Sequence, residues 1–550
     1  MWQYWSLREL QEEIGYDNLE FLEVVIPELD ESSRDGGFLS AKQKLVSLVS
    51  SLKDHDYFRK KRNLVSSFYG VPPNIRSRFC AELGVVDAIT DDELANYLLA
   101  DKEAYLKFLD FFELDSRFLA QEDAPRKPCF DSFPASKDMP KVITKPFKKL
   151  KFYQSDCITR LQPILNTPSS RAILQMPTGS GKTRTAMEAI VDHLNSEGKK
   201  QVVWLANTRE LCEQAIQCFL EVWDYVGTCN VRVNRIWGDY ISQIEDFSGA
   251  EKSFSVVSLQ GAWSILSKDE NRFDYIFEQT SLTVVDEAHI AVAKTYASVV
   301  KRINHRTNCI LLGLTATPGR TIESEVTELS ELFFQQIVSL QDPNSTRNDT
   351  IAFLRSIGVM SKAIHYPIIY DSVQKISSGE SKGLKEGKDF SESFLKKLGD
   401  DPNRVVALVK KVVNLLDQGA KIILFAPSVN NSFLVSAILT FLGYKSVHIS
   451  AKVSPSSRDS LIGKFVRGEY QILCNYGVLS TGFDAPSVDV VCIARPTKSA
   501  VLYSQMIGRG LRGKSVGGTE ECLILEVVDN FVGHGVQSDL YKLFDDYWCQ

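Results

Sequence analysis

One segment of the chain has the residue types and spacing of a phosphate-binding loop. It runs from Pro177 to Thr183, reads PTGSGKT, and lies between an apolar run at 172–174 and a helix-like run at 184–194. Glycines let backbone N–H groups close around phosphate oxygens, and the N-terminus of the following helix favours negative charge. Lys182 can reach the β- and γ-phosphates, and the Thr183 hydroxyl can ligate magnesium. The residues expected to contact a nucleotide here are Thr178, Gly179, Ser180, Gly181, Lys182 and Thr183.

A pair of acidic residues follows at a distance that suits the same site. Asp286 and Glu287 come directly after the short, β-branched run 281–285, which predicts a buried parallel strand that ends at the acids. Asp286 would hold magnesium and Glu287 would orient and deprotonate the attacking water, since phosphoryl transfer needs positioning and charge neutralisation. The alternative is a helix N-cap without chemistry, and the glycine loop in the same chain disfavours it. Together the two segments predict hydrolysis of a nucleoside triphosphate.

The composition sets limits on the class of protein. The chain has 550 residues, a net charge of −6 and 44% hydrophobic residues, which predicts about three or four domains. No apolar run approaches the roughly 18 residues that span a bilayer, and the start lacks the pattern of a signal peptide. The 11 cysteines include no Cys-x-x-Cys pair, which argues against a zinc site or a disulfide framework and favours the cytoplasm. The acidic balance gives no bulk attraction to nucleic acid, so binding would depend on local contacts.

The order of apolar runs predicts an α/β fold with two lobes. Residues 146–335 and 405–535 each alternate strands with helices, which is typical of a doubly wound parallel sheet. Only the first lobe opens on a glycine loop, so the nucleotide is expected in the cleft between the lobes. The strands are expected at 172–174, 202–205, 255–257, 282–285 and 310–312 in the first lobe, and at 421–425, 446–449, 471–474, 488–493 and 522–527 in the second.

The rest of the chain is expected to support these lobes. Residues 1–125 show helical spacing of apolar residues and a capping box at Thr90–Glu93, which predicts an independent, mostly α-helical N-terminal domain. Proline-bearing residues 126–145 are expected to be a linker. Residues 336–404 are expected to be a connector with a mobile polar excursion, and 536–550 a tail.

Two basic clusters leave a nucleic-acid contact outside the lobes open. Arg59–Arg62 follows Tyr57 and Phe58, and a second cluster at 145–151 is interleaved with phenylalanines. A basic and aromatic patch can grip a single strand, although such charge runs are more often solvated faces. The acidic start of the N-terminal domain repels phosphates, which favours docking of a protein partner over direct DNA binding.

With these motifs placed, residues 145–535 resemble superfamily 2 helicases of the DEAH-box type, most of all the RadD-like branch related to helicase subunits of restriction enzymes. The loop has Met176 where the general phosphate-loop pattern has glycine, and this shortened form is the one seen in helicases. The resemblance implies two tandem RecA-like lobes with ATP and Mg²⁺ between them.

The resemblance also implies roles for residues in both lobes. Tyr153 and Gln154 match the segment that reads adenine, and Asp484 would lie on the nucleotide side. The residues that would contact the nucleic-acid backbone are Arg209, Gln260, Ser428 and Thr481, and those that would couple hydrolysis to lobe movement are His289, Thr315 and Thr317. In the last motif, Gln505, Arg509 and Arg512 would act on the nucleotide. The two arginines are three residues apart and are expected on one helix face, where guanidinium forks suit phosphate oxygens.

The function implied is an ATP-dependent helicase or translocase. DNA is favoured over RNA by the family likeness alone, and little sequence specificity is expected because the motifs carry no base-reading groups. Open alternatives are an ATP-gated nucleic-acid sensor that recruits a protein effector, and an RNA helicase. No compact carboxylate–lysine cluster lies outside the ATP site, so strand cutting would need a partner such as a nuclease. A role in DNA repair or phage defence rests on the family likeness.

Overall fold

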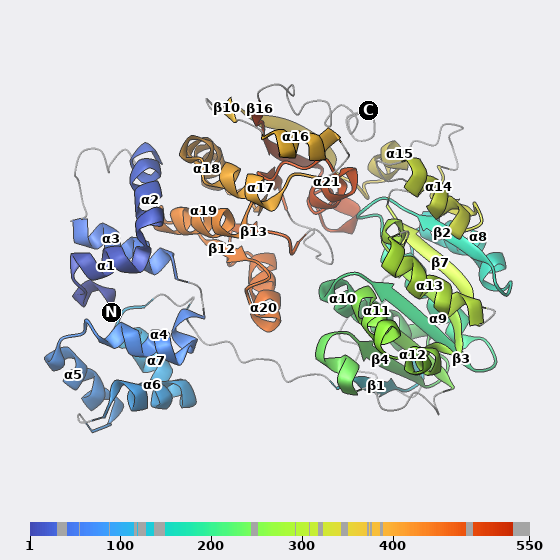
Figure 1. Cartoon of the computed structure of the whole chain (residues 1–550), viewed down its shortest axis with the longest axis horizontal. Coiled ribbons are helices and arrows are strands. Elements are labelled where there is room, and N and C mark those ends of the chain that lie inside the picture. The colour runs from blue at the N-terminus through green and yellow to red at the C-terminus, as the bar shows by residue number, and fades with distance from the viewer. Residues whose placement is uncertain are drawn as a thin grey trace.

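Three bodies follow one another across the molecule in the computed structural model (Figure 1). The helical N-terminal domain lies at one end, the second α/β lobe in the middle and the first α/β lobe at the other end. The residues described are 1–29, 41–53, 56–86, 89–114, 118, 128–136, 149–243, 251–291, 293–306, 309–316, 323–342, 350–370, 373–374, 377–385, 389–479 and 488–531. Within these residues, no helix combines the length and the apolar character needed to span a membrane.

The N-terminal domain is helical, as predicted. Its helices are α1 (Leu7–Ile14), α2 (Tyr16–Leu29), α3 (Ala41–Ser51), α4 (Lys61–Phe68), α5 (Pro73–Leu83), α6 (Asp91–Ala100) and α7 (Lys102–Phe111). The predicted capping box is present, because the Glu93 amide donates to Thr90 Oγ1 at 3.3 Å and the Thr90 amide donates to Glu93 Oε2 at 2.9 Å. Helix α6 therefore begins where the sequence predicts.

The aromatic residues beside the first basic cluster belong to the core of this domain. Phe58 is fully buried, and its ring packs against Trp2 and Phe108 at centroid distances of 5.4 and 5.3 Å. Tyr57 is half-buried and donates a hydrogen bond to Glu13 at 3.0 Å. Bases cannot stack on rings that are already covered, so the structure disfavours a strand-gripping patch at Tyr57 and Phe58.

The first lobe is built on an eight-stranded sheet in the order β1-β4-β5-β3-β6-β7-β2-β8. The strands are β1 (Phe130–Phe133), β2 (Arg171–Gln175), β3 (Lys200–Ala206), β4 (Val231–Ile236), β5 (Lys252–Ser258), β6 (Thr280–Asp286), β7 (Ile310–Thr315) and β8 (Ile337–Ser339). All pairings are parallel except that of β1 with β4. The predicted strands are all present, and β1, β4 and β8 are additional.

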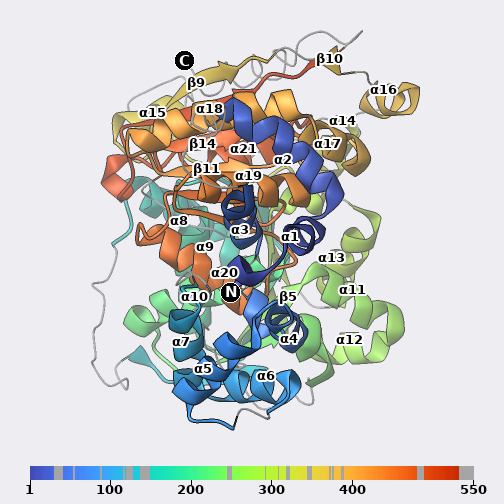
Figure 2. The same ribbon diagram turned by 90° about the vertical axis from the view of Figure 1, so that its left-hand side faces the viewer.

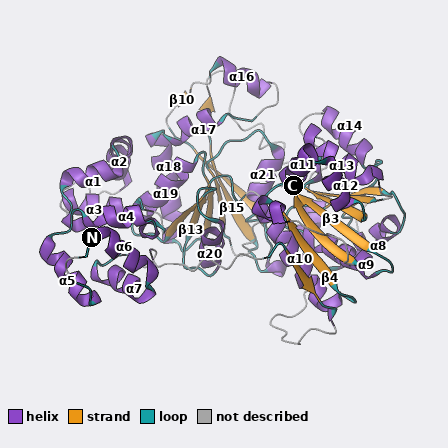
Figure 3. Ribbon diagram, turned by 60° about the horizontal axis from the view of Figure 1, so that its bottom comes forward, coloured by secondary structure: helices purple, strands orange, loops and turns teal. Residues whose placement is uncertain are grey.

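Helices cover both faces of this sheet, which Figure 3 shows as strands between helical layers. Helices α8 (Phe152–Leu165), α9 (Lys182–Asn195) and α10 (Arg209–Val226) bury one face, and α11 (Leu259–Lys268), α12 (Glu270–Phe277), α13 (Lys294–Arg306) and α14 (Glu323–Leu332) bury the other. Along β2, Leu174 joins the first apolar cluster and the adjacent Ile173 joins the second, because side chains alternate across a strand. The sheet is therefore fixed from both sides.

The second lobe has a parallel six-stranded sheet in the order β12-β13-β11-β14-β15-β9. Its strands are β9 (Lys362–Ile368), β11 (Ile422–Phe425), β12 (Ser446–Ile449), β13 (Ile472–Asn475), β14 (Val490–Ile493) and β15 (Glu521–Val527). Helices α18 (Pro402–Asp417) and α19 (Val429–Phe441) pack on one face, and α20 (Pro455–Val466) and α21 (Ala500–Ile507) on the other. The five predicted strands are confirmed.

Two segments expected to connect domains instead complete the sheets. Within the expected linker, β1 pairs with β4, and within the expected connector, β8 pairs with β2 while β9 pairs with β15. The expected polar excursion contains the short strand β10 (Val373–Gln374), paired with β16 (Asn530–Phe531), and helix α16 (Ser378–Lys385). Helix α17 (Glu392–Gly399) follows it, and α15 (Thr350–Ser356) lies between the lobes in sequence. The expected tail, 536–550, lies outside the described residues.

The N-terminal domain packs on the second lobe and is not a separate module. Helix α2 lies against α18 and α3 against α19, and the two views in Figures 1 and 2 agree on this arrangement. One cluster of buried apolar side chains includes the cores of α2, α3, α18 and α19. Lys410 and Glu28 add an ion pair of 3.7 Å at its edge. Apolar side chains of both bodies thus meet in one core, whereas the sequence predicts an independent domain.

Candidate nucleotide and nucleic-acid site between the lobes

The glycine loop is shaped by two glycines in the left-handed region. It connects β2 to α9, and Gly179 and Gly181 have φ angles of +84° and +89°. The left-handed backbone at Gly181 favours glycine, and a Cβ atom there would also displace the end of the Gln154 side chain, whose Nε2 would lie 2.4 Å away. Helix α9 begins at Lys182 and directs its N-terminal amides toward the loop. The loop thus has the form that binds phosphate at a helix N-terminus.

Tyr153 and Gln154 support this loop from helix α8. The Tyr153 hydroxyl donates to the Ser180 carbonyl at 2.9 Å, and both residues are buried. Gln154 donates to the Gly181 carbonyl at 3.4 Å and accepts from the Lys151 amide at 2.8 Å. The structure therefore brings the pair predicted to read adenine into direct contact with the phosphate loop.

Asp286 and Glu287 lie at the end of β6, opposite the loop. Glu287 Oε1 is 3.7 Å from Lys182 Nζ, and Glu287 Oε2 is 3.4 Å from His289 Nδ1. The Glu287 amide donates to Asp286 Oδ1 at 3.0 Å. Glu287 has φ +53°, a left-handed conformation that costs a residue with a side chain on the order of 1 kcal/mol.

The two carboxyl groups have opposite pKa shifts. Burial raises the pKa of Asp286 to about 6, against the opposing effect of Lys182. Burial also opposes ionisation of Glu287, but Lys182, His289, Arg509 and a hydrogen bond from Gln505 together hold its pKa below the usual value. A carboxylate that stays ionised and accepts hydrogen bonds is suited to orient a water molecule.

Gln505 and Arg509 reach this carboxylate from the second lobe. Gln505 lies on α21, and the 9% exposed Arg509 lies in the turn that follows it. The expectation that Arg509 and Arg512 share a helix face is wrong, because α21 ends at Ile507. A Cβ on Gly508 would come within 2.5 Å of Thr178 Cγ2, so the chain passes directly over the phosphate loop at this point. The half-buried Arg512 forms a β-bridge with Met360 instead.

Further contacts hold the lobes together around the site. Arg458 at α20 forms an ion pair with Glu210 at α10. Lys151 Nζ donates to Ser515 Oγ at 3.2 Å. Sequence reasoning missed these pairs, because partners more than 200 residues apart leave no local pattern.

The three described residues that are predicted to contact nucleic acid lie at the starts of helices. Arg209 is the first residue of α10, whose N-cap Thr208 accepts from the Leu211 amide. Ser428 is the N-cap of α19 and accepts from the Asn431 amide at 3.1 Å. Gln260, in the first turn of α11, donates to Asn207 at 2.8 Å. Amides at helix N-termini are donors suited to phosphate oxygens.

The remaining predicted residues divide between the core and the undescribed segments. Thr315 is fully buried at the end of β7, and its carbonyl accepts from the Met176 amide at 3.1 Å, which joins this strand to the phosphate loop. Thr317, Thr481 and Asp484 lie outside the described residues.

The donor set fits magnesium and a nucleoside triphosphate. The Thr183 hydroxyl and the Asp286 carboxylate are hard oxygen donors of the kind that Mg²⁺ binds. Asp286 is buried and its pKa is raised, so a cation beside it would favour the ionised form. Lys182 and the left-handed glycines Gly179 and Gly181 supply the cationic and backbone groups that phosphates need.

Comparisons with known proteins agree with this geometry. Residues 147–320 match the family model described as type III restriction enzyme, res subunit, and residues 405–514 match the helicase conserved C-terminal domain. The chain is 26% identical over 377 residues to a 51.5 kDa protein of a Lactococcus phage, covering 68% of this chain and 69% of the phage protein. It is 24% identical over 374 residues to the putative ATP-dependent helicase IRC3 of Saccharomyces cerevisiae, covering 66% of this chain and 49% of that protein.

Similarity to solved structures concerns the fold. Dbp5 of S. cerevisiae, solved bound to RNA and ADP BeF3, aligns with a TM-score of 0.50 and 15% identity over 73% of this chain and 88% of Dbp5. Two parallel-sheet lobes with a phosphate loop in the first define the class of ATP-hydrolysing, RecA-like two-lobed proteins. The two matched models identify the two lobes as superfamily 2 helicase domains, and the model that matches the first lobe is the one for the restriction-enzyme res subunit. The chain spans about half the length of the yeast relative.

Proposed function

We propose that the chain is a motor that uses ATP hydrolysis to move along a nucleic-acid strand, with DNA preferred, and to separate strands. The observation that carries this proposal is the position of Glu287. Its carboxylate faces Lys182 from the first lobe and Gln505 and Arg509 from the second. Because groups from both lobes meet at one carboxylate, turnover and lobe closure are linked in one site.

Each group has a distinct role in this mechanism. The loop amides and Lys182 would bind the β- and γ-phosphates, and Thr183 and Asp286 would hold Mg²⁺, which supplies positive charge to the phosphate oxygens when bound. Glu287 orients the attacking water and accepts its proton. Arg509, with Arg512 and Gln505, stabilises the charge that develops on the γ-phosphate. After hydrolysis Arg509 no longer interacts with the γ-phosphate, and the second lobe is free to move.

Movement of the lobes acts on the nucleic acid through backbone contacts. Arg209 and Gln260 in the first lobe and Ser428 in the second lie at helix N-termini, where amide donors suit phosphates. Thr481 is proposed for the second lobe on the family motif, as is Asp484 on the nucleotide side. His289, Thr315 and Thr317 would couple the two events. Phosphate contacts carry no sequence information, so binding is expected to be salt-sensitive and unspecific.

The restriction-enzyme branch supports DNA over RNA as the substrate. The alternatives are an RNA helicase, and a sensor in which ATP turnover changes residence time and a protein effector is recruited.

The acidic N-terminal domain supports docking of a protein partner such as a nuclease. The described cysteines are all free, which supports a reducing compartment such as the cytoplasm. DNA repair and phage defence are the pathways that the family likeness favours.

ATPase assays against four nucleic acids test the proposal. Full-length chain is assayed with single-stranded DNA, duplex DNA, forked DNA and RNA, and strand separation is followed on the fork by release of a labelled strand. DNA-stimulated turnover together with ATP-dependent release supports the motor. Stimulated turnover without release supports the sensor, and stimulation by RNA alone supports the RNA helicase.

A further inference from the structure

The loop between β14 and α21 leads into the lobe-2 side of the site. Residues 494–499 connect a central strand of the second sheet to the helix that carries Gln505 and ends just before Arg509. The loop lies between the motif residues Asp484 and Gln505 and belongs to neither motif. Its backbone and side chains are nevertheless held by residues from 384–404, the part of the chain that contains α17 and the start of α18.

Asp389 makes the central contacts with this loop. Its Oδ2 accepts from the Thr497 hydroxyl at 2.9 Å, and its Oδ1 accepts from the Lys498 amide at 2.8 Å. Arg495 Nη2 lies 3.9 Å from the same carboxylate. Hydrogen bonds to an ionised carboxylate are stronger than those between neutral groups, so this contact fixes the loop firmly.

The hydrogen bonds continue from Asp389 into helix α21. Thr497 Oγ1 accepts from the Ser499 amide at 3.0 Å, and Ser499 Oγ accepts from the Leu502 amide at 3.2 Å as the N-cap of α21. Thr497 is only 6% exposed, so its hydroxyl has little access to water as an alternative partner. The direction and starting point of α21 therefore depend on Asp389 through two residues.

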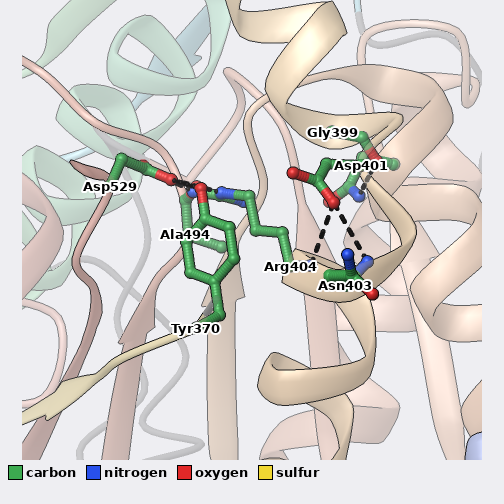
Figure 4. Close-up of polar contacts among 8 residues, drawn as sticks. Tyr370, Gly399, Asp401, Asn403, Arg404, Ala494 and Asp529 are labelled. Atoms are coloured by element: carbon green, nitrogen blue, oxygen red, sulfur yellow. Dashed lines mark hydrogen bonds and ion pairs between the residues drawn. The ribbon is translucent and has the colours of Figure 1, made fainter. Parts of the chain in front are cut away.

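A second contact fixes the other end of the loop. The fully buried Arg404 on α18 donates from Nη2 to the Ala494 carbonyl at 2.6 Å, as Figure 4 shows. The same side chain forms an ion pair with Asp529 at 2.7 Å, and Tyr370 donates to that carboxylate at 2.6 Å. Both ends of the loop are thus tied to one short region of the chain.

The region that carries Asp389 is itself held in place. An apolar cluster joins α16 to α17, and its members are Leu384, Phe390, Phe394, Leu395 and Leu398. The rings of Phe390 and Phe394 stack at a centroid distance of 5.6 Å. Lys498 Nζ also donates to the Leu384 carbonyl at 3.4 Å. Asp389 precedes Phe390 directly, so this cluster determines where its carboxylate lies.

We propose that Asp389 is a positioning residue for ATP hydrolysis. Through Thr497, Ser499 and α21, it determines how Gln505 and Arg509 approach Glu287. This inference rests on the proposed function of Glu287 and Arg509. A displacement of about 1 Å at a reacting centre can cost on the order of 100-fold in rate. A change at Asp389 acts on the turnover step, because the phosphate loop that binds ATP lies in the other lobe.

The test compares three variants of the full-length chain with a matched control. Asp389→Ala removes both acceptors, Asp389→Asn keeps one oxygen acceptor, and Thr497→Val removes the hydroxyl at nearly equal volume. Glu392→Ala, an exposed acid on α17, is the control. We expect Asp389→Ala and Thr497→Val to lower kcat of the nucleic-acid-stimulated ATPase about 10-fold or more with an unchanged KM for ATP. Asp389→Asn should recover part of the loss, and Glu392→Ala should match the unchanged chain.

A double variant, Asp389→Ala with Arg509→Ala, distinguishes a positioning role of Asp389 from a general loss of stability. Because Asp389 acts through α21, which leads directly into the turn that holds Arg509, Asp389→Ala should lower kcat of the Arg509→Ala chain less than it lowers kcat of the unchanged chain. An equal cost in both backgrounds, or a loss of kcat that comes with a lower unfolding midpoint and a higher KM, overturns the inference. Should Arg509→Ala alone keep normal turnover, the arginine assignment of the proposed function fails. The Asp389 inference is then decided by the kcat of Asp389→Ala and Thr497→Val, and normal values overturn it.

Discussion

Lys182 and Glu287 face each other at 3.7 Å but have different tasks, and substitutions should separate them. Lys182→Ala removes a cation that binds phosphate, so we expect weak ATP binding. Glu287→Gln keeps the size of the side chain but cannot accept a proton, so we expect ATP binding to persist while turnover falls by about 100-fold or more. Binding of a fluorescent ATP analogue and steady-state ATPase rates measure the two effects. Wild-type turnover in Glu287→Gln would show that another group activates the water.

Arg509 and Arg512 differ in their surroundings although the motif treats them as a pair. Arg509 is buried and its charge acts on Glu287, whereas Arg512 is half-buried and its backbone bridges to Met360. We expect Arg509→Ala to lower single-turnover hydrolysis by about 10³-fold, the typical cost of removing an arginine finger. Arg512→Ala should also lower it. The unfolding midpoint should change little in either variant, and normal hydrolysis in both would exclude the two-lobed mechanism.

At the scale of elements, the strands that can be predicted from the sequence are those that consist of a short run of apolar residues. The glycine loop and the acidic pair were predicted in place because each follows a short apolar strand. Strand β4 was missed because its sequence VRVNRI carries three polar residues. Asn234 donates to Ser255 on the neighbouring strand, and Arg235 pairs with Asp131 on β1. Buried polar groups are tolerated when such partners exist, and those partners are distant in sequence.

The edges of the sheets and the end of α21 escaped prediction for related reasons. Strand β9 contains Pro367, which disfavours a strand assignment except at a sheet edge, and β9 is an edge strand. Helix α21 ends early at the glycines that follow it. A Cβ on Gly510 would lie 2.5 Å from Cys522 Sγ and Val491 Cγ2, so packing against the sheet determines this turn. Helical periodicity carries no information on such a contact.

His448 on strand β12 makes the free energy of unfolding depend on pH. Burial, with a smaller effect from Lys452, lowers its pKa to about 4, and Ser432 and Ser450 hydrogen-bond to its ring at 2.8 and 3.2 Å. Between pH 6.5 and about pH 4, His448 is protonated in the unfolded chain but neutral in the folded chain. The free energy of unfolding therefore falls as the pH falls through this range. The protonation of His448 alone should lower the free energy of unfolding by about 2 kcal/mol when the pH falls from 7.5 to 5.

Urea unfolding at both pH values measures this term. His448→Asn should be less sensitive to the drop in pH than the unchanged chain, because the substituted side chain has no proton to bind. His305→Asn, at an exposed position, is the matched control for replacing a histidine with asparagine. Equal pH dependence in His448→Asn and the unchanged chain would show that the histidine ring is protonated in the folded state as readily as in the unfolded one.

At the scale of the whole molecule, the N-terminal domain is packed on the second lobe. Helices α2 and α3 share one apolar core with α18 and α19, whereas the nucleotide site lies on the opposite side of that lobe, facing the first lobe. A motion of the second lobe during ATP turnover would therefore carry the helical domain with it. A protein bound to that domain would be displaced at each cycle, which would link the proposed protein partner to the motor without any contact at the ATP site.

A chain without residues 1–125 tests whether this core is shared. Its removal exposes the apolar faces of α18 and α19 to water, so we expect a lower unfolding midpoint for the second lobe and self-association. Thermal unfolding and sizing chromatography measure these effects. Lys410→Gln in the full chain is the control, because it removes only a half-exposed ion pair with Glu28, a contact worth at most about 1 kcal/mol. A shortened chain that stays monomeric with an unchanged midpoint would mean that the two bodies fold independently, and that the helical domain does not move as one with the lobe.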